Sequence, residues 1–259
     1  MNFALVNLFY TITLLLGMLV LLEVGRRIGL KQMAVDKEGA LAGIGTTEGA
    51  VLALMGLLIA FSFSGAAARF DARRAQIVTE AGSISSAYAL IDVLPPDAQP
   101  RLRETFRQYL DSRLEAYRRM PDLAAAKEEL DRSKALQHDI FTQAVNATSG
   151  TGHEADEVLI LPAIGQMISI SNQRTAALFS HPPTIVFIML AGLMLVGSLL
   201  AGYGMASVKS HNWMHTFALA IVLALTFYVI RDLEYPRLPG LVGLSDFDNV
   251  LIELRDSIR

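Results

Sequence analysis

The stretch Thr46–Arg74, TTEGAVLALMGLLIAFSFSGAAARFDARR, decides the fold of this chain. No charged residue lies between Glu48 and Arg69, and this length is enough for an α-helix to cross the hydrocarbon core of a bilayer. Charged residues then follow without an intervening proline, so we expect the helix to continue out of the membrane into a polar domain. These charges are Arg69, Asp71, Arg73 and Arg74.

Small residues recur along this predicted helix at steps of three or four, which places them on one helical face. In lipid, such a face lets another helix approach closely. The sequence therefore predicts a helix that packs centrally in a bundle or in an oligomer. The stripe consists of Gly49, Ala53, Gly56, Ala60 and Ser64.

The composition of the whole chain is that of an integral membrane protein. The 259 residues are 53% hydrophobic and only 18% charged, and the apolar residues fall in four charge-free blocks with a long polar middle. The absence of cysteine excludes disulfides, thiol catalysis and cysteine-ligated metals. A net charge of -3 without a basic tail argues against nucleic acid as a partner, whereas the lipid bilayer is the expected one.

These blocks predict an all-α membrane protein with four spans and a helical extramembrane domain between spans 2 and 3. Residues 1–68 are expected to hold membrane helices 1 and 2, with a retained first span rather than a cleaved signal peptide. Residues 69–182 are expected to form the polar domain from the extension of helix 2, a hairpin and a return helix. Residues 183–230 would hold membrane helices 3 and 4, and residues 231–259 an interfacial tail.

Within the polar domain, apolar residues seven apart predict a heptad seam on the extension of helix 2. Pro95 and Pro96 end this helix. A basic helix capped by Asp97 and a more acidic helix beginning at Pro121 and Asp122 are then expected to form an antiparallel hairpin. The alternative is that their charged faces are simply solvated. The seam residues are Phe70, Ile77, Ile84 and Ile91.

Motifs for catalysis or metal binding are not recognisable in the sequence. His211 and His215 have the spacing of a metal-ligand pair but lack an identifiable third ligand. Asp246 and Asp248 lack the glycine and distal glutamate of an EF-hand, and we interpret Ser245–Asp248 as the cap of a last helix. We therefore expect no metal, no cofactor and no enzyme activity.

Helices 2 and 4 should leave the membrane on the same face, which brings two charged segments to one bilayer level. We predict that Asp232 and Glu234 pair there with Arg69, Arg73 or Arg74. The alternative is that these side chains are independent interfacial anchors. Basic residues occur on both predicted faces, so the positive-inside rule leaves the topology open.

Several of these segments together resemble the bestrophin-like membrane proteins, which are grouped as a domain of unknown function. The resemblance covers nearly the whole chain, and its strongest part is Glu48–Arg74. Ser169 occupies a position where the family pattern has an acidic residue, so no role of that acid is transferred to this chain. The other matching segments are Leu94–Pro96, Met167 and Ile168 with Arg174, and Asp232–Pro236.

The resemblance implies a likeness to bestrophins, which are pentameric anion channels with a cytoplasmic polar domain and a narrow apolar neck formed by the second membrane helix. Carried over, the neck falls on Phe61, Ser62, Phe63 and Ser64. The first functional hypothesis is thus a homo-oligomeric channel, a pentamer by this likeness, in the plasma or bacterial inner membrane. The cluster Arg69, Arg73 and Arg74 would concentrate small inorganic anions at its mouth.

Two alternatives remain open on the sequence. For either Phe61 or Phe63 taken alone, ordinary helix packing is a stronger explanation than a pore constriction. The second functional hypothesis, after the channel, is a non-conducting, membrane-anchored interaction or scaffold protein, in which the heptad seam would bind the partner.

Overall fold

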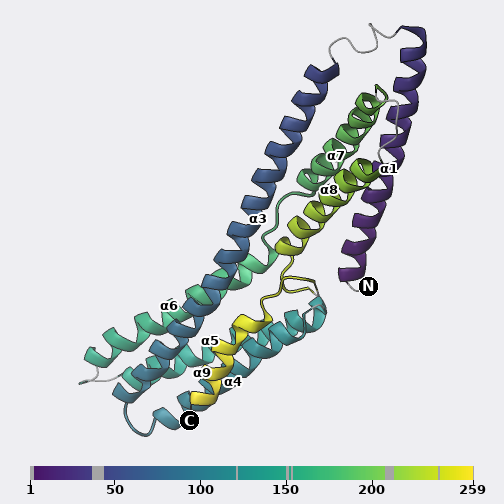
Figure 1. The fold of residues 1–259 in the computed structure, drawn as a ribbon. Helices are drawn as coiled ribbons and strands as arrows, with labels where there is room; N and C mark the ends of the chain where they lie inside the picture. The colour runs from purple at the N-terminus through teal and green to yellow at the C-terminus, as the bar shows by residue number, and fades with distance from the viewer. Residues whose placement is uncertain are drawn as a thin grey trace. The chain divides into compact units, whose positions relative to one another are not determined.

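The computed structural model describes residues 3–36, 44–120, 122–149, 152, 154–207, 213–238 and 240–258. These residues form helices joined by short connections, with no strand among them (Figure 1). Four helices of the described chain are long and apolar enough to cross a membrane, which confirms the predicted fold class. The chain divides into unit 1, Met1–Arg69 with His181–Tyr235, and unit 2, Phe70–Ser180 with Pro236–Arg259.

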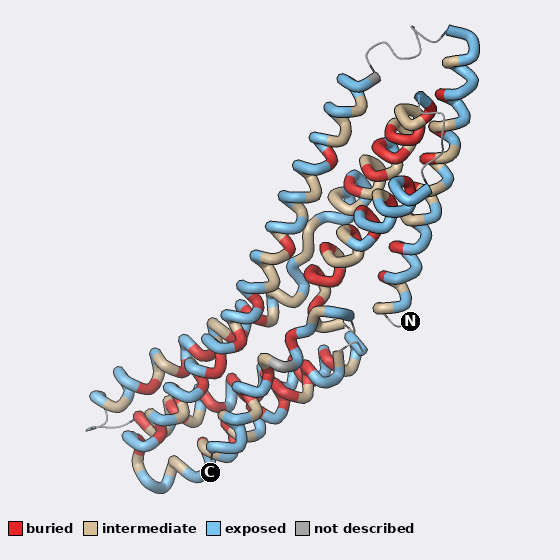
Figure 2. Tube along the Cα trace, viewed as in Figure 1, coloured by how far each residue is buried: buried red, intermediate tan, exposed pale blue. Residues whose placement is uncertain are grey.

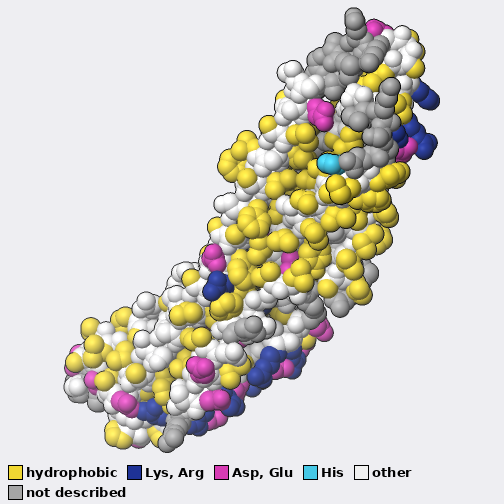
Figure 3. Space-filling model, viewed as in Figure 1, with side chains coloured by type: hydrophobic (Ala, Val, Ile, Leu, Met, Phe, Trp, Pro, Cys, Tyr) yellow, Lys and Arg dark blue, Asp and Glu magenta, His cyan; other side chains and the backbone are white. Residues whose placement is uncertain are grey.

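Unit 1 contains the apolar helices. They are α1 (Phe3–Val35), the first part of α3 (Ile44–Ala89), α7 (Thr184–Met205) and α8 (Trp213–Glu234). Figure 3 shows hydrophobic side chains covering the visible face of these helices.

Two helices of unit 1 run further than the sequence predicted. The charges and glycines of Ile28–Gly45 predict a short connection between the first two spans. This prediction is wrong up to Val35, because α1 continues as a helix through these residues. The reason is packing, since Gly29 on this extension lies against α7. Helix α8 likewise runs one turn past Ile230 and buries Asp232 and Glu234.

Helices α1 and α7 cross at glycines, with their backbones in close contact. A Cβ atom added to Gly25 would lie 2.0 Å from the carbonyl oxygen of Leu199, and one added to Gly202 would lie 2.0 Å from that of Leu22. Gly25 and Gly29 are four residues apart, as in the motif that lets membrane helices approach closely.

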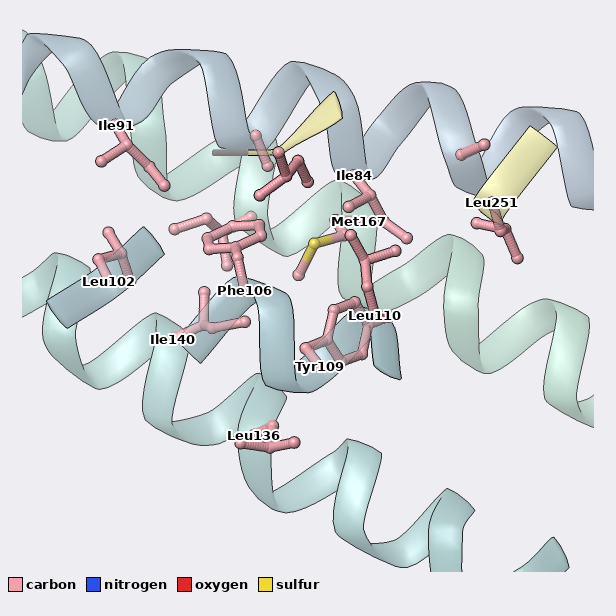
Figure 4. Close-up of a cluster of buried hydrophobic side chains, with 14 of the residues drawn as sticks. Ile84, Ile91, Leu102, Phe106, Tyr109, Leu110, Leu136, Ile140, Met167 and Leu251 are labelled. Atoms are coloured by element: carbon pink, nitrogen blue, oxygen red, sulfur yellow. The ribbon is translucent and has the colours of Figure 1, made fainter. Parts of the chain in front are cut away.

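Unit 2 is a helical domain around its own hydrophobic core. It contains the second part of α3, the 3-10 turn η1 (Leu90–Val93), α4 (Gln99–Arg118), α5 (Leu123–Thr148), α6 (Glu154–Phe179), the 3-10 turn η2 (Ser245–Asp248) and α9 (Asn249–Ser257). The heptad seam faces this core, because Ile77, Ile84 and Ile91 are fully buried. Figure 4 shows Ile84 and Ile91 with Phe106 of α4, Ile140 of α5 and Met167 of α6.

The C-terminal segment packs within unit 2. Residues 236–258 belong to this unit, and Leu251 and Ile258 are part of its hydrophobic core. The prediction that Ser245 caps the last helix is wrong, since neither η2 nor α9 has a side-chain cap.

The predicted hairpin in unit 2 is present with one cap confirmed and one corrected. The carboxylate of Asp122 accepts hydrogen bonds from the amides of Ala124 and Ala125 and so caps α5. Asp97 does not cap α4, whose first residue follows Ala98 without a side-chain bond. Pro121 lies outside the described residues.

Candidate functional site

The membrane part of α3 has one face turned toward the other helices of unit 1. Met55 and Ala66 on this face are buried, and Met55 packs at Gly197 of α7, where an added Cβ would lie 3.4 Å from its sulfur. Ile59 and Ser62 are half-buried and fall between them at steps of three or four residues. These four residues therefore mark the face of α3 that packs against other helices of the same chain.

The opposite face of α3 carries the predicted small-residue stripe and has no neighbour among the described residues. A Cβ added to Gly49 or Gly56 would meet nothing within 4 Å, and Ala53 and Ala60 are exposed. In Figure 2, most of the membrane part of α3 is coloured exposed or intermediate. Only 11% of the apolar window of α3 is buried, against 28% to 33% in the other three spans. The close neighbour that the stripe predicts therefore does not come from the described part of this chain.

The four candidate pore residues lie on different sides of α3, because successive residues turn by about 100° around a helix. Phe61 is 67% exposed and Phe63 is 45% exposed, and Ser64, the last residue of the small-residue stripe, is exposed. Ser62 is half-buried on the row of Met55 and Ala66. The described part of the chain thus provides little packing for either phenylalanine.

At the end of this span, the structure confirms one of the predicted ion pairs. The Nε atom of Arg69 donates to both carboxylate oxygens of Glu234, at 2.9 Å and 3.1 Å, and the side chain of Glu234 is 1% exposed. Asp232 is also buried. A partly buried ion pair therefore joins the last unit 1 residue of α3 to the last residue of α8.

The other two arginines of the cluster make contacts within unit 2. Arg73 is buried and donates to the carbonyl oxygens of Ala177 and Ser180, at 3.3 Å and 2.8 Å, at the C-terminal end of α6. Arg74 pairs with Asp71 at 3.2 Å, and its guanidinium lies 4.3 Å from the ring centroid of Phe247.

Neutralising Glu234 is expected to destabilise unit 1. In Glu234→Gln, Arg69 loses its carboxylate, and because Arg69 is 38% exposed we expect a cost of about 1–2 kcal/mol rather than that of a fully buried pair. The double variant Arg69→Gln with Glu234→Gln should recover part of this loss. Thermal unfolding of the detergent-solubilised protein measures both, with Asp71→Asn in the exposed Arg74 pair as control. Purely additive effects of the two changes would contradict the pair.

Unit 2 contains a buried charge network whose members share no spacing in the sequence. Glu80 of α3 is fully buried, and its carboxylate lies 2.6 Å from Nη2 of Arg113 on α4. Its other oxygen accepts a hydrogen bond from Arg174 of α6. Arg174 also donates to Asp248, at 3.0 Å, so the network reaches the C-terminal segment.

The network continues to Arg237 and is organised around one aromatic ring. Arg237 binds both carboxylate oxygens of Asp248. Three guanidinium groups lie over the ring of Tyr117. The distance from the guanidinium carbon to the ring centroid is 3.9 Å for Arg174, 4.5 Å for Arg237 and 5.1 Å for Arg113. Burial raises the pKa of the Tyr117 hydroxyl, so this ring stays neutral at ordinary pH.

A neutral hydrogen-bond chain lies close to the charge network. The hydroxyl of Tyr109 is 2.9 Å from that of Ser171 and accepts from Gln137 at 3.1 Å. Burial raises the pKa of Tyr109 to about 12. Residues of α3, α4, α5, α6 and η2 and of the segment after α8 contribute to these polar contacts. Arg174 and Asp248 had been singled out in the sequence, but nothing there placed them together.

The structure offers no candidate metal centre within its described residues. No group of three or more His, Asp or Glu side chains able to hold a metal occurs there. His215 is exposed, while His211 and the side chain of Asp246 lie outside the described residues.

Comparison with known proteins identifies relatives of both sequence and fold. A family model described as a bestrophin-like domain matches residues 12–236. Two single-substitution variants of a bacterial bestrophin homologue from Klebsiella pneumoniae have similar structures, with TM-scores of 0.71 and 0.70 at 11% and 10% sequence identity. The matches cover 94% and 95% of this chain and 98% of each homologue, which establishes a shared fold. No curated protein sequence matches the chain.

Proposed function

Because the chain belongs to the bestrophin-like family, we propose that this integral membrane protein is a homo-oligomeric channel for small inorganic anions, with α3 lining the pore. The observation that carries the proposal is the open face of α3. A helix with this much uncovered surface, bearing a stripe of small residues, fits between copies of itself around a common axis. A pentamer is the stoichiometry that the family likeness suggests.

The narrowest part of the proposed pore lies at Phe61. This side chain is the most exposed aromatic residue on the described membrane part of α3, and Leu57, one turn earlier, is 52% exposed. An apolar ring of this kind restricts hydrated ions, and the exposed Ser64 hydroxyl one turn later offers a hydrogen bond to an anion that has lost water. Ser62 is not assigned to the pore lining, because it lies on the side of α3 that faces its own chain.

The charge cluster at the end of the span contributes little to anion selection in this proposal. Arg69 and Arg74 each have a carboxylate partner, and Arg73 is buried against backbone carbonyls. Ion preference therefore rests on the cost of dehydration in the neck. Larger anions that lose water easily are expected to permeate better, so iodide should pass faster than chloride.

Anion flux through liposomes containing the purified oligomer tests the proposal. Phe61→Ala is expected to raise iodide flux several-fold, because it widens the apolar neck. The matched control is Phe9→Ala on α1, since Phe9 is also 67% exposed but lies on a helix that is not assigned to the pore. Absence of flux from a confirmed oligomer, or equal effects of the two substitutions, would contradict the channel.

The alternative function, a non-conducting scaffold protein, required an exposed heptad seam, and the seam is not exposed. The heptad seam was the expected partner-binding surface, but Ile77, Ile84 and Ile91 are fully buried in the core of unit 2. We therefore favour the channel and propose no catalytic role. By the same family likeness, we propose a location in the plasma or bacterial inner membrane with unit 2 in the cytoplasm.

A further inference from the structure

Unit 2 contains a cavity next to the buried charge network. Its volume is about 470 Å³, and it lies between the C-terminal half of α4, the segment after α8 and the start of α9. This space is far larger than a single ion or water needs. Its lining includes the apolar side chains Leu114, Pro236, Leu238 and Ile252 together with the basic side chains Arg118 and Arg237.

The charged side chains around this cavity carry a net positive charge. The adjoining network has three arginines, Arg113, Arg174 and Arg237, but only two carboxylates, those of Glu80 and Asp248. Asp248 also lines the cavity, but both of its oxygens are already bound by arginines. A buried positive charge without a counter-charge is costly, so an anion in this space would be stabilised.

One donor of the network is also left without a partner. The Nε atom of Arg237 is buried and makes no hydrogen bond within the described structure, although the Arg237 side chain is only 10% exposed. Arg118 adds a second guanidinium to the lining from α4. Two guanidinium groups that border one cavity match the geometry of a carboxylate, which accepts several N–H donors.

From these observations we propose that the cavity binds a small organic carboxylate. The carboxylate group would contact Arg118 and Nε of Arg237, and the apolar body would lie against Leu114, Leu238 and Ile252. The apolar lining and the volume favour this class over a bare inorganic anion. A neighbouring cavity of about 430 Å³ lacks the same imbalance, because its four arginines face four carboxylates.

Calorimetric titration of the detergent-solubilised full chain with benzoate tests the site independently of ion conduction. Benzoate is expected to bind saturably, whereas benzamide, which has the same shape without the charge, should not bind. Chloride at the same concentration should not displace benzoate. Equal heats for benzoate and benzamide, or displacement by chloride, would overturn the proposal.

Two variants locate the site without disturbing the buried network. Arg118→Gln removes an exposed guanidinium and is expected to weaken benzoate binding about tenfold. Gly243→Leu should abolish binding by filling space, since Gly243 lines the cavity and an added Cβ would meet only Ser245 Oγ, at 3.6 Å. Arg119→Gln, at the adjacent residue that lines only the other cavity, is the control and should bind normally. Unchanged binding in both test variants, with melting temperatures as in the parent, would place benzoate elsewhere.

Discussion

Replacing Glu80 by glutamine is expected to destabilise unit 2 by about 3–5 kcal/mol, the cost typical of removing one member of a buried ion network. Glu80 is fully buried and its carboxylate serves both Arg113 and Arg174. Glutamine keeps the shape of the side chain but leaves two buried guanidinium groups without their shared counter-charge. Desolvation of these groups is then no longer offset.

Thermal unfolding of the purified protein measures this effect, and the midpoint should fall by roughly 10 °C for a domain of this size. Glu115→Gln is the matched control, because Glu115 also pairs with an arginine, Arg119, but both side chains are 40% exposed. An exposed pair of this kind contributes at most about 1 kcal/mol. If Glu80→Gln melted at the same temperature as the control, the network would not be stabilising as described.

Gly202→Ala is expected to disrupt unit 1, although it adds only one methyl group. The new Cβ atom would lie 2.0 Å from the carbonyl oxygen of Leu22, and backbone cannot rotate away as a side chain can. Helices α1 and α7 would have to separate, which costs well over the roughly 1–3 kcal/mol typical of overpacking. The yield of folded protein in detergent should drop sharply, and the remaining protein should melt at a lower temperature.

Gly192→Ala on the same helix is the control for this prediction. A Cβ atom added to Gly192 would meet nothing within 4 Å among the described residues, so the folded yield should remain at the level of the parent. Gly25→Ala should behave like Gly202→Ala, since its Cβ would lie 2.0 Å from the Leu199 carbonyl oxygen. Normal yield for both close-contact variants would show that the two helices are further apart than described.

The position of the spans could be read from the sequence because it depends on local chemistry. Long runs without charge must lie in lipid or in a protein core, and the segments after Glu48 and Thr184 begin and end close to where charge and proline predict. The heptad seam was equally readable, since Ile77, Ile84 and Ile91 repeat at a helical period. What covers that seam was not readable, and the structure shows that it is the core of unit 2.

The candidate site was predictable only in part. The sequence predicted that Asp232 and Glu234 pair with Arg69, Arg73 or Arg74, because two charged segments were expected at one level of the membrane, and the Arg69–Glu234 pair is present. It did not separate Ser62 from its neighbours Phe61 and Phe63, since a run of four residues covers the whole circumference of a helix. It also did not distinguish Gly49 and Gly56 of α3, which are open in the described chain, from Gly25 and Gly202, which are in close contact.

By itself, then, the sequence determined the fold class, the four apolar helices and the long α3, because hydrophobic length and periodicity are properties of consecutive residues. Only the tertiary structure decided that the C-terminal segment completes unit 2 and that Glu80, Arg113, Arg174, Asp248 and Arg237 form one buried network. These residues come from separate elements and share no spacing. Their attraction acts through space at short range, so it becomes visible only when the chain has folded.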